Sequence, residues 1–305
     1  MILVTGGAGF IGSNLVDALL EKRYCVRVID DLSSGEIENL ERASGSKDFE
    51  FIRGDIRKVG KDLLQDVETV FHEAAQIDVR RSVADPVHDL DVNVAGTLNL
   101  LENMRKVGIG KIIYASSGGA VYGNPEYLPC DEKHPTNPIS PYGVSKLVAE
   151  KYIQVYHELY GMDYVNLRYS NVYGPRQDPQ GEAGVISIFL GRILNGEKPI
   201  VFGDGLQTRD YLHVHDVVEA NLLAMSGKLG DGTFNLGAGK GTSVNDLIAL
   251  MREIMNKEII AEHAEERKGE VRNIFLDISK IEKLGFKPKH GLRDGIKSVL
   301  EWMGG

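Results

Sequence analysis

The chain has 305 residues, of which 42% are hydrophobic and 26% charged, a composition typical of a folded globular protein. Its 35 basic and 44 acidic residues give a net charge of −9, which argues against nucleic acid or an anionic membrane as the main partner. It has two cysteines, no basic signal-peptide region and no apolar run approaching ~18 residues, so we expect a cytoplasmic protein without a disulfide framework.

Short apolar runs alternate with amphipathic stretches along the first half of the chain. We expect buried strands over 2–5, 26–30, 49–54, 67–72, 111–116 and 163–168, and helices over 12–22, 89–107 and 142–160. This alternation predicts an α/β fold with a Rossmann-type, doubly wound parallel sheet. From residue 171 the pattern breaks up, which indicates a smaller C-terminal region over 171–305. Segments 210–214 and 234–236 are expected to return to the sheet.

A glycine-rich turn follows the first expected strand and opens the first helix. Gly6, Gly9 and Gly12 have the order and spacing of a dinucleotide-binding loop. Glycines allow the backbone to turn tightly and approach a pyrophosphate, and the helix N-terminus presents free N–H groups to that anion. Residues 1–170, with returning segments near 210–240, are therefore predicted to form the dinucleotide-binding domain, and residues 171–305 mainly the substrate-binding region.

An acidic residue ends the second expected strand, at the distance from the glycine loop where a ribose contact is expected. A carboxylate at Asp30 accepts hydrogen bonds from the adenosine hydroxyls and repels a 2′-phosphate, which favours NAD over NADP. The neighbouring Asp31 is the alternative ribose contact. Arg27, a basic residue on the same strand, leaves NADP binding open as a second possibility. Asp55, after the third strand, is either an adenine contact or a turn aspartate at the surface.

A tyrosine and a lysine begin the long helix over 142–160. Tyr142 and Lys146 are four residues apart and share one helix face. A nearby ammonium favours the phenolate and lowers the pKa of a tyrosine, which would provide a general base near neutral pH. Such pairs also occur by chance on surface helices, but the glycine loop makes the catalytic interpretation the stronger one.

Together with further motifs, these residues resemble the extended short-chain dehydrogenase/reductase family, specifically its NAD-dependent nucleotide-sugar epimerases and dehydratases and, within them, the UDP-hexose 4-epimerases. The matching segments span about residues 1 to 275. They are 5–12, Asp30-Asp31, 54–56, 72–76, Asn93 with 96–97, 142–146, 168–175 and 209–214.

The resemblance implies NAD as cofactor, a UDP-hexose as substrate and a homodimer paired through the helices over 89–107 and 142–160. It assigns cofactor contacts to Gly6, Gly9, Phe10, Ile11, Gly12, Asp30, Asp31, Asp55, Ile56, Ala74, Ala75, Asn93, Tyr142, Lys146, Tyr169 and Ser170. It assigns substrate contacts to Asn171, Val185, Val201, Phe202, Arg209, Arg267 and Glu270, where Arg209 would hold the diphosphate unless it forms a surface salt bridge.

Two alternatives to an epimerase remain open. Dehydratases and decarboxylases of this family typically carry acids just before the tyrosine of a Val-Tyr-Gly motif, and the corresponding residues here are Gly119 and Ala120, before Tyr122. This favours an epimerase. A non-catalytic NAD-binding regulator is the second alternative, and the presence of both Tyr142 and Lys146 argues against it.

The chain departs from the family at one hydroxyl. Relatives place Ser or Thr four residues before the tyrosine of that motif, where this chain has Gly118. An unbulged strand would aim the adjacent Ser117 away from the site, whereas an irregular Gly118-Gly119 backbone would let it turn inward. We expect Tyr142 to act directly on the sugar oxygen, with Ser117 as a secondary catalytic contact.

Histidines are the remaining candidates for chemistry. His213 and His215 have no nearby cysteine, and His72 lies far from both in sequence. Metal sites need several converging ligands, so we expect packed or solvated histidines and no metal.

Overall fold

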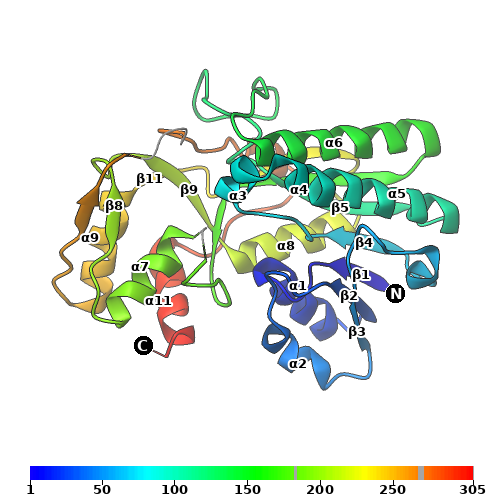
Figure 1. Cartoon of the computed structure of the whole chain (residues 1–305), viewed down its shortest axis with the longest axis horizontal. Helices are drawn as coiled ribbons and strands as arrows, with labels where there is room; N and C mark the ends of the chain where they lie inside the picture. Colours follow the sequence, from blue (N-terminus) through cyan, green and yellow to red (C-terminus); the bar gives the residue numbers. More distant parts are fainter. Residues whose placement is uncertain (182–183, 267–270, 305) are drawn as a thin grey trace.

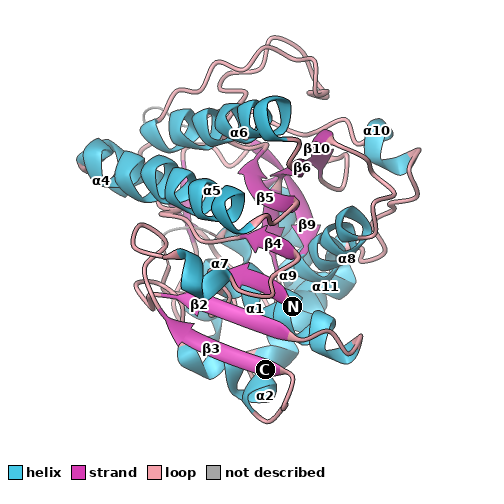
Figure 2. Ribbon diagram, turned by 90° about the vertical axis from the view of Figure 1, so that its right-hand side faces the viewer, coloured by secondary structure: helices cyan, strands magenta, loops and turns pink. Residues whose placement is uncertain are grey.

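The computed structural model describes residues 1–181, 184–266 and 271–304. Seven parallel strands form a central sheet in the order β10-β6-β5-β4-β1-β2-β3 (Figures 1 and 2). The strand order reverses between β1 and β4, the position where doubly wound sheets bind dinucleotides. The predicted fold class is therefore confirmed. The strands are β1 (Ile2–Thr5), β2 (Val26–Asp30), β3 (Phe49–Arg53), β4 (Thr69–His72), β5 (Lys111–Ser117), β6 (Asp163–Tyr169) and β10 (Gly232–Leu236).

Helices cover both faces of this sheet. On one face α1 (Phe10–Glu21) packs beside α8 (Val214–Met225), and on the other α5 (Gly96–Val107) lies beside α6 (Pro141–Tyr160) (Figure 1). Each face has its own apolar core, because strand side chains alternate between the two faces. The remaining elements of this larger lobe are η1 (Ile37–Leu40), α2 (Glu41–Ser44), η2 (Lys61–Leu64), α3 (Val79–Ala84), α4 (Pro86–Leu90), the π-helical η3 (Asp91–Ala95) and α10 (Ser279–Glu282).

A smaller lobe with its own core is built mostly from the second half of the chain (Figure 1). It contains a three-stranded sheet, β11-β9-β7, and a two-stranded sheet, β12-β8. Its elements are β7 (Asn171–Tyr173), α7 (Val185–Leu194), β8 (Ile200–Phe202), β9 (Thr208–His213), β11 (Gly241–Ser243), α9 (Val244–Met255), β12 (Glu262–Ala264) and α11 (Leu292–Trp302).

One predicted return to the central sheet is correct and one is wrong. Residues 234–236 lie in β10, which pairs with β6. Residues 210–214 were expected in the same sheet, but β9 pairs with β7 and β11 in the smaller lobe. Most of β9 is buried, and burial makes a strand apolar whichever sheet it joins. The chain then re-enters the larger lobe through α8 and β10.

Among the described residues no helix combines the length and apolarity needed to cross a bilayer. Cys25 is exposed and Cys130 is buried, and both are free thiols.

Candidate active site

The glycine loop between β1 and α1 has no room for side chains. Gly6 has a φ of +68°, and a Cβ there would lie 2.6 Å from the backbone nitrogen of Ala74. A Cβ on Gly12 would lie 2.2 Å from the carbonyl oxygen of Gly6. Gly9 precedes α1, and no side chain caps this helix. The first-turn N–H groups are thus left for an anion, as expected for a loop that cradles a pyrophosphate.

Asp30, at the end of β2, forms a hydrogen bond with the glycine loop. Its carboxylate accepts hydrogen bonds from the N–H groups of Ala8 and Leu32, both at 2.9 Å, and burial raises its pKa. Asp31 is exposed and accepts instead from the N–H of Ser33. Of the two aspartates, Asp30 is therefore the one placed beside the glycine loop.

We expect replacement of Asp30 by Ser to weaken NAD more than NADP, so that the ratio of the two dissociation constants changes by about tenfold. The lost carboxylate would have bonded the ribose hydroxyls and repelled a phosphate. Titration of cofactor-stripped protein with both cofactors measures this ratio. Asp31→Ser is the matched control and should leave it unchanged. An unchanged ratio in Asp30→Ser would refute the assignment.

The segment after β4 is fixed by a buried amide. The Oδ1 atom of Asn93 accepts from the N–H of Gln76 at 2.9 Å, and its Nδ2 donates to the carbonyl of Gln76 at 2.9 Å and to Asp89 at 3.0 Å. Asn93 thus holds the backbone that continues from Ala74 and Ala75, and it is 2% exposed. The Asn93 side chain thus forms its hydrogen bonds within the protein, and Ala74 and Ala75 are left to line the predicted cofactor site.

The predicted adenine contacts lie after β3. The carboxylate of Asp55 accepts from Nε and Nη2 of Arg57 at 3.0 and 2.7 Å, and this ion pair lowers its pKa. Ile56 is buried against Gly96, where a Cβ would come within 2.8 Å of it. The aspartate therefore has an ion pair within the protein, in addition to any ligand contact.

The N-terminus of α6 carries the predicted catalytic pair, Tyr142 and Lys146. Ser140 caps the helix by accepting from the N–H of Gly143 at 3.1 Å, and Pro141 occupies its first position. This places Tyr142 in the first turn, with its ring 5.8 Å from the Nζ atom of Lys146. The same ammonium donates to the carbonyl of Ala115 on β5 at 2.9 Å. The helix start and the central strand together fix the pair.

Ser117, the last residue of β5, lies on the side of the catalytic tyrosine. Its hydroxyl lies close enough to the phenol of Tyr142 to lower the pKa of that phenol. The backbone turns sharply after it, because the N–H of Val121 donates to the carbonyl of Ser117 at 3.1 Å. A Cβ on Gly118 would meet Leu276 at 2.7 Å. The irregular glycine pair is therefore compatible with an inward serine, and the neighbouring position has no space for a side chain.

Burial has the largest effect on the pKa values of Tyr142 and Lys146 in the protein without cofactor. It raises the pKa of Tyr142 to about 12, although the nearby Ser117 hydroxyl opposes this, and it lowers the pKa of Lys146 to about 8. The expected lowering of the tyrosine pKa is thus not produced by the protein alone. A positively charged nicotinamide ring beside the phenol would act in the required direction.

Sequence reasoning missed a glutamate at this site. Glu73 follows β4, and its Oε1 accepts from the Tyr169 hydroxyl at 2.9 Å, while that hydroxyl accepts from Asn221 at 2.7 Å. Burial raises the pKa of Glu73 to about 7, opposed by the Tyr169 bond and by Lys146. Its only signal in the sequence is a charged residue directly after a buried strand. Next to Tyr169, the buried hydroxyl of Ser170 has no partner within the described structure. A nicotinamide carboxamide would suit it.

His72 is part of the core and not of the site. Its ring nitrogens lie 2.7 Å from Thr5 Oγ1 and 2.9 Å from Thr97 Oγ1, and burial lowers its pKa to about 3. This histidine links β4 with β1 and α5, as the expected packed histidine would.

Five of the predicted substrate residues lie on β7, α7, β8 and β9 of the smaller lobe, and they differ in exposure. Asn171 begins β7, is exposed, and with Gly118, Gly119 and Ile274 lines a small depression beside β5. Val185 begins α7 and is partly exposed. Val201 is 1% exposed within the core of the smaller lobe and so is not accessible to a ligand, which makes the prediction for this residue wrong, whereas Phe202 is partly exposed. Arg267 and Glu270 lie outside the described residues.

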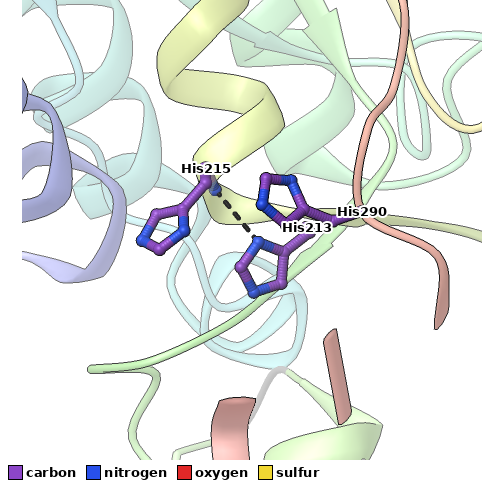
Figure 3. A group of neighbouring side chains, drawn as sticks. All are labelled: His213, His215 and His290. Carbon is purple, nitrogen blue, oxygen red and sulfur yellow. Dashed lines mark hydrogen bonds between the residues drawn. The ribbon is translucent and has the colours of Figure 1, made fainter. Parts of the chain in front are cut away.

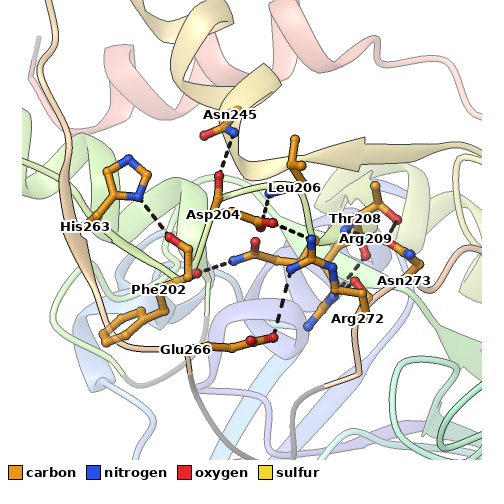
Figure 4. A network of polar contacts seen from close by, with 12 residues as sticks. Phe202, Asp204, Leu206, Thr208, Arg209, Asn245, His263, Glu266, Arg272 and Asn273 are labelled. Atoms are coloured by element: carbon orange, nitrogen blue, oxygen red, sulfur yellow. Dashed lines mark hydrogen bonds and ion pairs between the residues drawn. The ribbon is translucent and has the colours of Figure 1, made fainter.

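The predicted diphosphate arginine belongs to a polar network on β9 (Figure 4). Arg209 Nη1 donates to the carbonyls of Thr208 and Arg272 at 2.9 and 3.2 Å. Arg272, which sequence reasoning missed, pairs with Asp204 at 2.7 Å and lies 3.9 Å from Glu266. Two guanidinium groups thus lie beside the exposed edge of the smaller lobe, a donor set suited to phosphate oxygens.

Comparison with known proteins agrees with this geometry. The GDP-mannose 4,6 dehydratase family model matches residues 3–299. A putative UDP-glucose 4-epimerase from Methanocaldococcus jannaschii is 54% identical, covering 99% of this chain and 98% of the relative. UDP-glucose 4-epimerase from Thermotoga maritima, solved with UDP-glucose, superposes with a TM-score of 0.94 at 46% identity, covering 99% and 98% of the two chains. UDP-glucose 4-epimerase from Thermus thermophilus, solved with NAD, gives 0.92 at 40% identity, covering 100% and 99%.

The chain therefore belongs to the extended short-chain dehydrogenase/reductase family of nucleotide-sugar epimerases and dehydratases. The prediction of NAD as cofactor is confirmed for this family, since several solved structures with this fold contain bound NAD. Other matches include epimerases of UDP-N-acetylglucosamine and UDP-glucuronate and a dTDP-glucose dehydratase, so membership alone leaves the substrate open.

Proposed function

We propose that this enzyme interconverts UDP-glucose and UDP-galactose by transient oxidation at C4 of the sugar. The observation that carries the proposal is the placement of three side chains next to one another. Ser117 ends β5, and it lies beside Tyr142 and Lys146 at the start of α6. The similarity to 4-epimerases over the whole chain supports the same reaction.

The chain's own residues hold the sugar and move one proton. Tyr142 removes the proton of the sugar 4-hydroxyl as C4 is oxidised to a ketone, and returns it when C4 is reduced. The glycine loop and Lys146 would hold NAD, which would supply the hydride acceptor for the oxidation of C4 and the hydride donor for its reduction. Lys146 holds the nicotinamide ribose and favours the phenolate. Arg209 holds the diphosphate, so that the sugar can turn over while the nucleotide stays bound.

Water elimination, the dehydratase reaction, needs an acid beside the sugar. Gly119 and Ala120 occupy the places where related dehydratases carry acids, and neither has an ionisable group. The acids that act on Lys146 each have other partners: Glu73 accepts from Tyr169, Asp89 accepts from Gln76 and Asn93, and Glu150 pairs with Arg168. This favours epimerisation over elimination.

A coupled assay tests the proposal. UDP-galactose is supplied, and UDP-glucose is detected with an added dehydrogenase that acts on it; UDP-N-acetylgalactosamine and UDP-glucuronate are compared in parallel by product chromatography. We expect the highest kcat/KM with UDP-galactose and no net consumption of NAD. A stable 4-keto product would show a dehydratase. Higher kcat/KM with either other sugar would show a different substrate. No turnover, and no transient absorbance of reduced cofactor, would favour a regulator.

The outer face of α3, α4 and α6 carries an apolar patch that supports a homodimer paired through α6, one of the two helices predicted for this role, whereas the patch has no residue on α5. Val87 is 76% exposed and Leu159 65%, and the patch continues over neighbouring exposed side chains on the same helices. These helices pack against one another at the top of the molecule in Figure 1. An apolar face of this kind marks an interface, and a second copy of the chain would bury it in a four-helix arrangement. The patch consists of Val79, Val83, Val87, Leu90, Val144, Tyr152, Val155 and Leu159.

We expect the double variant Val155→Glu/Leu159→Glu to be monomeric, because burying two carboxylates in a symmetric interface costs several kcal/mol. Sedimentation at micromolar concentration measures the state. Trp302→Glu, an exposed aromatic outside the patch, is the control and should leave the wild-type dimer intact. A wild-type monomer, or a double variant that stays dimeric, would contradict the interface.

A further inference from the structure

Three histidines from β9, from α8 and from the segment before α11 meet at one place in the fold (Figure 3). His213 ends β9, His215 lies in the first turn of α8, and His290 lies two residues before α11. One ligand atom of each lies within 4.8 Å of the others. The ring centroids are 4.7, 4.9 and 5.6 Å apart. Imidazoles on one tetrahedral ion with bonds of ~2.1 Å have centroids roughly 5 Å apart, so the spacing is close to that of a metal site.

His290 has the orientation of a metal ligand. Its Nδ1 lies 2.9 Å from Oδ1 of Asp216, a carboxylate that is 1% exposed. Asp216 also accepts from the N–H groups of Lys289 and His290 at 3.0 and 3.1 Å, which fixes its position. A carboxylate accepts only from a protonated Nδ1, so in the neutral ring Nε2 of His290 keeps its lone pair. Metal-binding histidines commonly have this carboxylate partner.

His215 and His213 differ in availability. The ring of His215 is exposed, and no described residue forms a hydrogen bond with it. His213 Nε2 lies 3.0 Å from the Ser298 hydroxyl, and Nδ1 accepts from the His215 N–H at 3.3 Å. That long bond is the one an ion would replace. The neighbouring cation, Arg176, is paired with Asp17 at 2.6 Å. Its charge is therefore balanced locally.

We propose that His215 and His290, joined by His213, bind a divalent transition metal that prefers imidazole ligands, such as Zn²⁺, Co²⁺ or Ni²⁺. Water would complete the coordination. The ion would join α8, which packs on the larger lobe, to the segment before α11 of the smaller lobe. Its effect is on stability, because the ligands lie outside the catalytic residues. The prediction of no metal site was based on residues close together in the sequence. His290 lies 75 residues beyond His215, so the sequence pattern does not connect the two.

The test uses the full chain without an affinity tag, dialysed against a chelator. Calorimetric titration with Zn²⁺ should give one saturable site per chain, and Co²⁺ should give a ligand-field spectrum of nitrogen coordination. His215→Ala and His290→Gln should each weaken Zn²⁺ binding by at least about tenfold and abolish the rise in melting temperature that Zn²⁺ produces in the wild type. Neither variant should change turnover without metal. His263→Ala, an exposed histidine on β12, is the matched control and should bind as the wild type does.

Absence of saturable Zn²⁺ binding, or equal binding by the wild type and both cluster variants, would overturn the proposal. Circular dichroism and metal-free turnover separate loss of the site from misfolding. If His215→Ala alone perturbs α8, His290→Gln still decides, because it lies on a loop and keeps a side chain of similar size.

Discussion

Replacement of Tyr142 by Phe should reduce kcat by at least about a thousandfold while NAD stays bound. In the proposed mechanism the phenol takes the sugar 4-hydroxyl proton, and general acid–base catalysis is worth ~10²–10⁴-fold. Phenylalanine keeps the ring beside Lys146, so the helix start and its Ser140 cap are preserved. Turnover of UDP-galactose and the content of bound cofactor are the two measurements. A variant that retains a tenth of wild-type kcat would show that another group is the base.

Ser117→Ala is the matched variant that separates direct action from a relay. The Ser117 hydroxyl lies near the Tyr142 phenol, and loss of even a full neutral hydrogen bond costs about 0.5–1.5 kcal/mol. We therefore expect less than about tenfold loss of kcat, or ~1.4 kcal/mol. A thousandfold loss with cofactor binding intact would show that the serine hydroxyl carries the proton. The family's hydroxyl would then have moved by one residue and kept its function.

Replacement of Glu150 by Ala should destabilise the fold by about 3–5 kcal/mol, because it leaves a buried guanidinium without its partner. Glu150 on α6 is fully buried and accepts from Nε and Nη2 of Arg168 at 2.9 and 2.7 Å, and it also bonds Ser116. Arg168 further donates to the Tyr122 hydroxyl at 3.0 Å. The network ties α6 to β5 and β6. It therefore supports the helix that carries Tyr142.

Denaturant unfolding followed by circular dichroism measures this loss. Glu262→Ala removes an ion pair with Lys198 in which both side chains are more than half exposed, and should cost less than about 1 kcal/mol. The double variant Glu150→Leu/Arg168→Met removes both charges and should recover much of the stability lost in Glu150→Ala. Equal free energies of unfolding for Glu150→Ala and Glu262→Ala would contradict the importance of the buried pair.

The sequence by itself determined the features that depend on local physics. Apolar runs and their spacing gave the strands and helices of the central sheet, because a buried parallel strand must be apolar along its length. The glycine spacing gave the loop, since only a backbone without Cβ atoms fits where Gly6 meets Ala74. The four-residue spacing of Tyr142 and Lys146 gave the catalytic pair, because helix geometry alone places them on one face.

The tertiary structure decided what depends on partners distant in sequence. β9 has the apolar pattern of a central strand but pairs with β7 and β11, and no local signal selects among possible partner strands. The Val201 side chain is buried in a core because of the packing of the smaller lobe. The Ser117 side chain lies near Tyr142 because the backbone turns after β5. Glu73 met Tyr169 across 96 residues, and His290 met His215 across 75. Such contacts arise only when the folded elements are brought together.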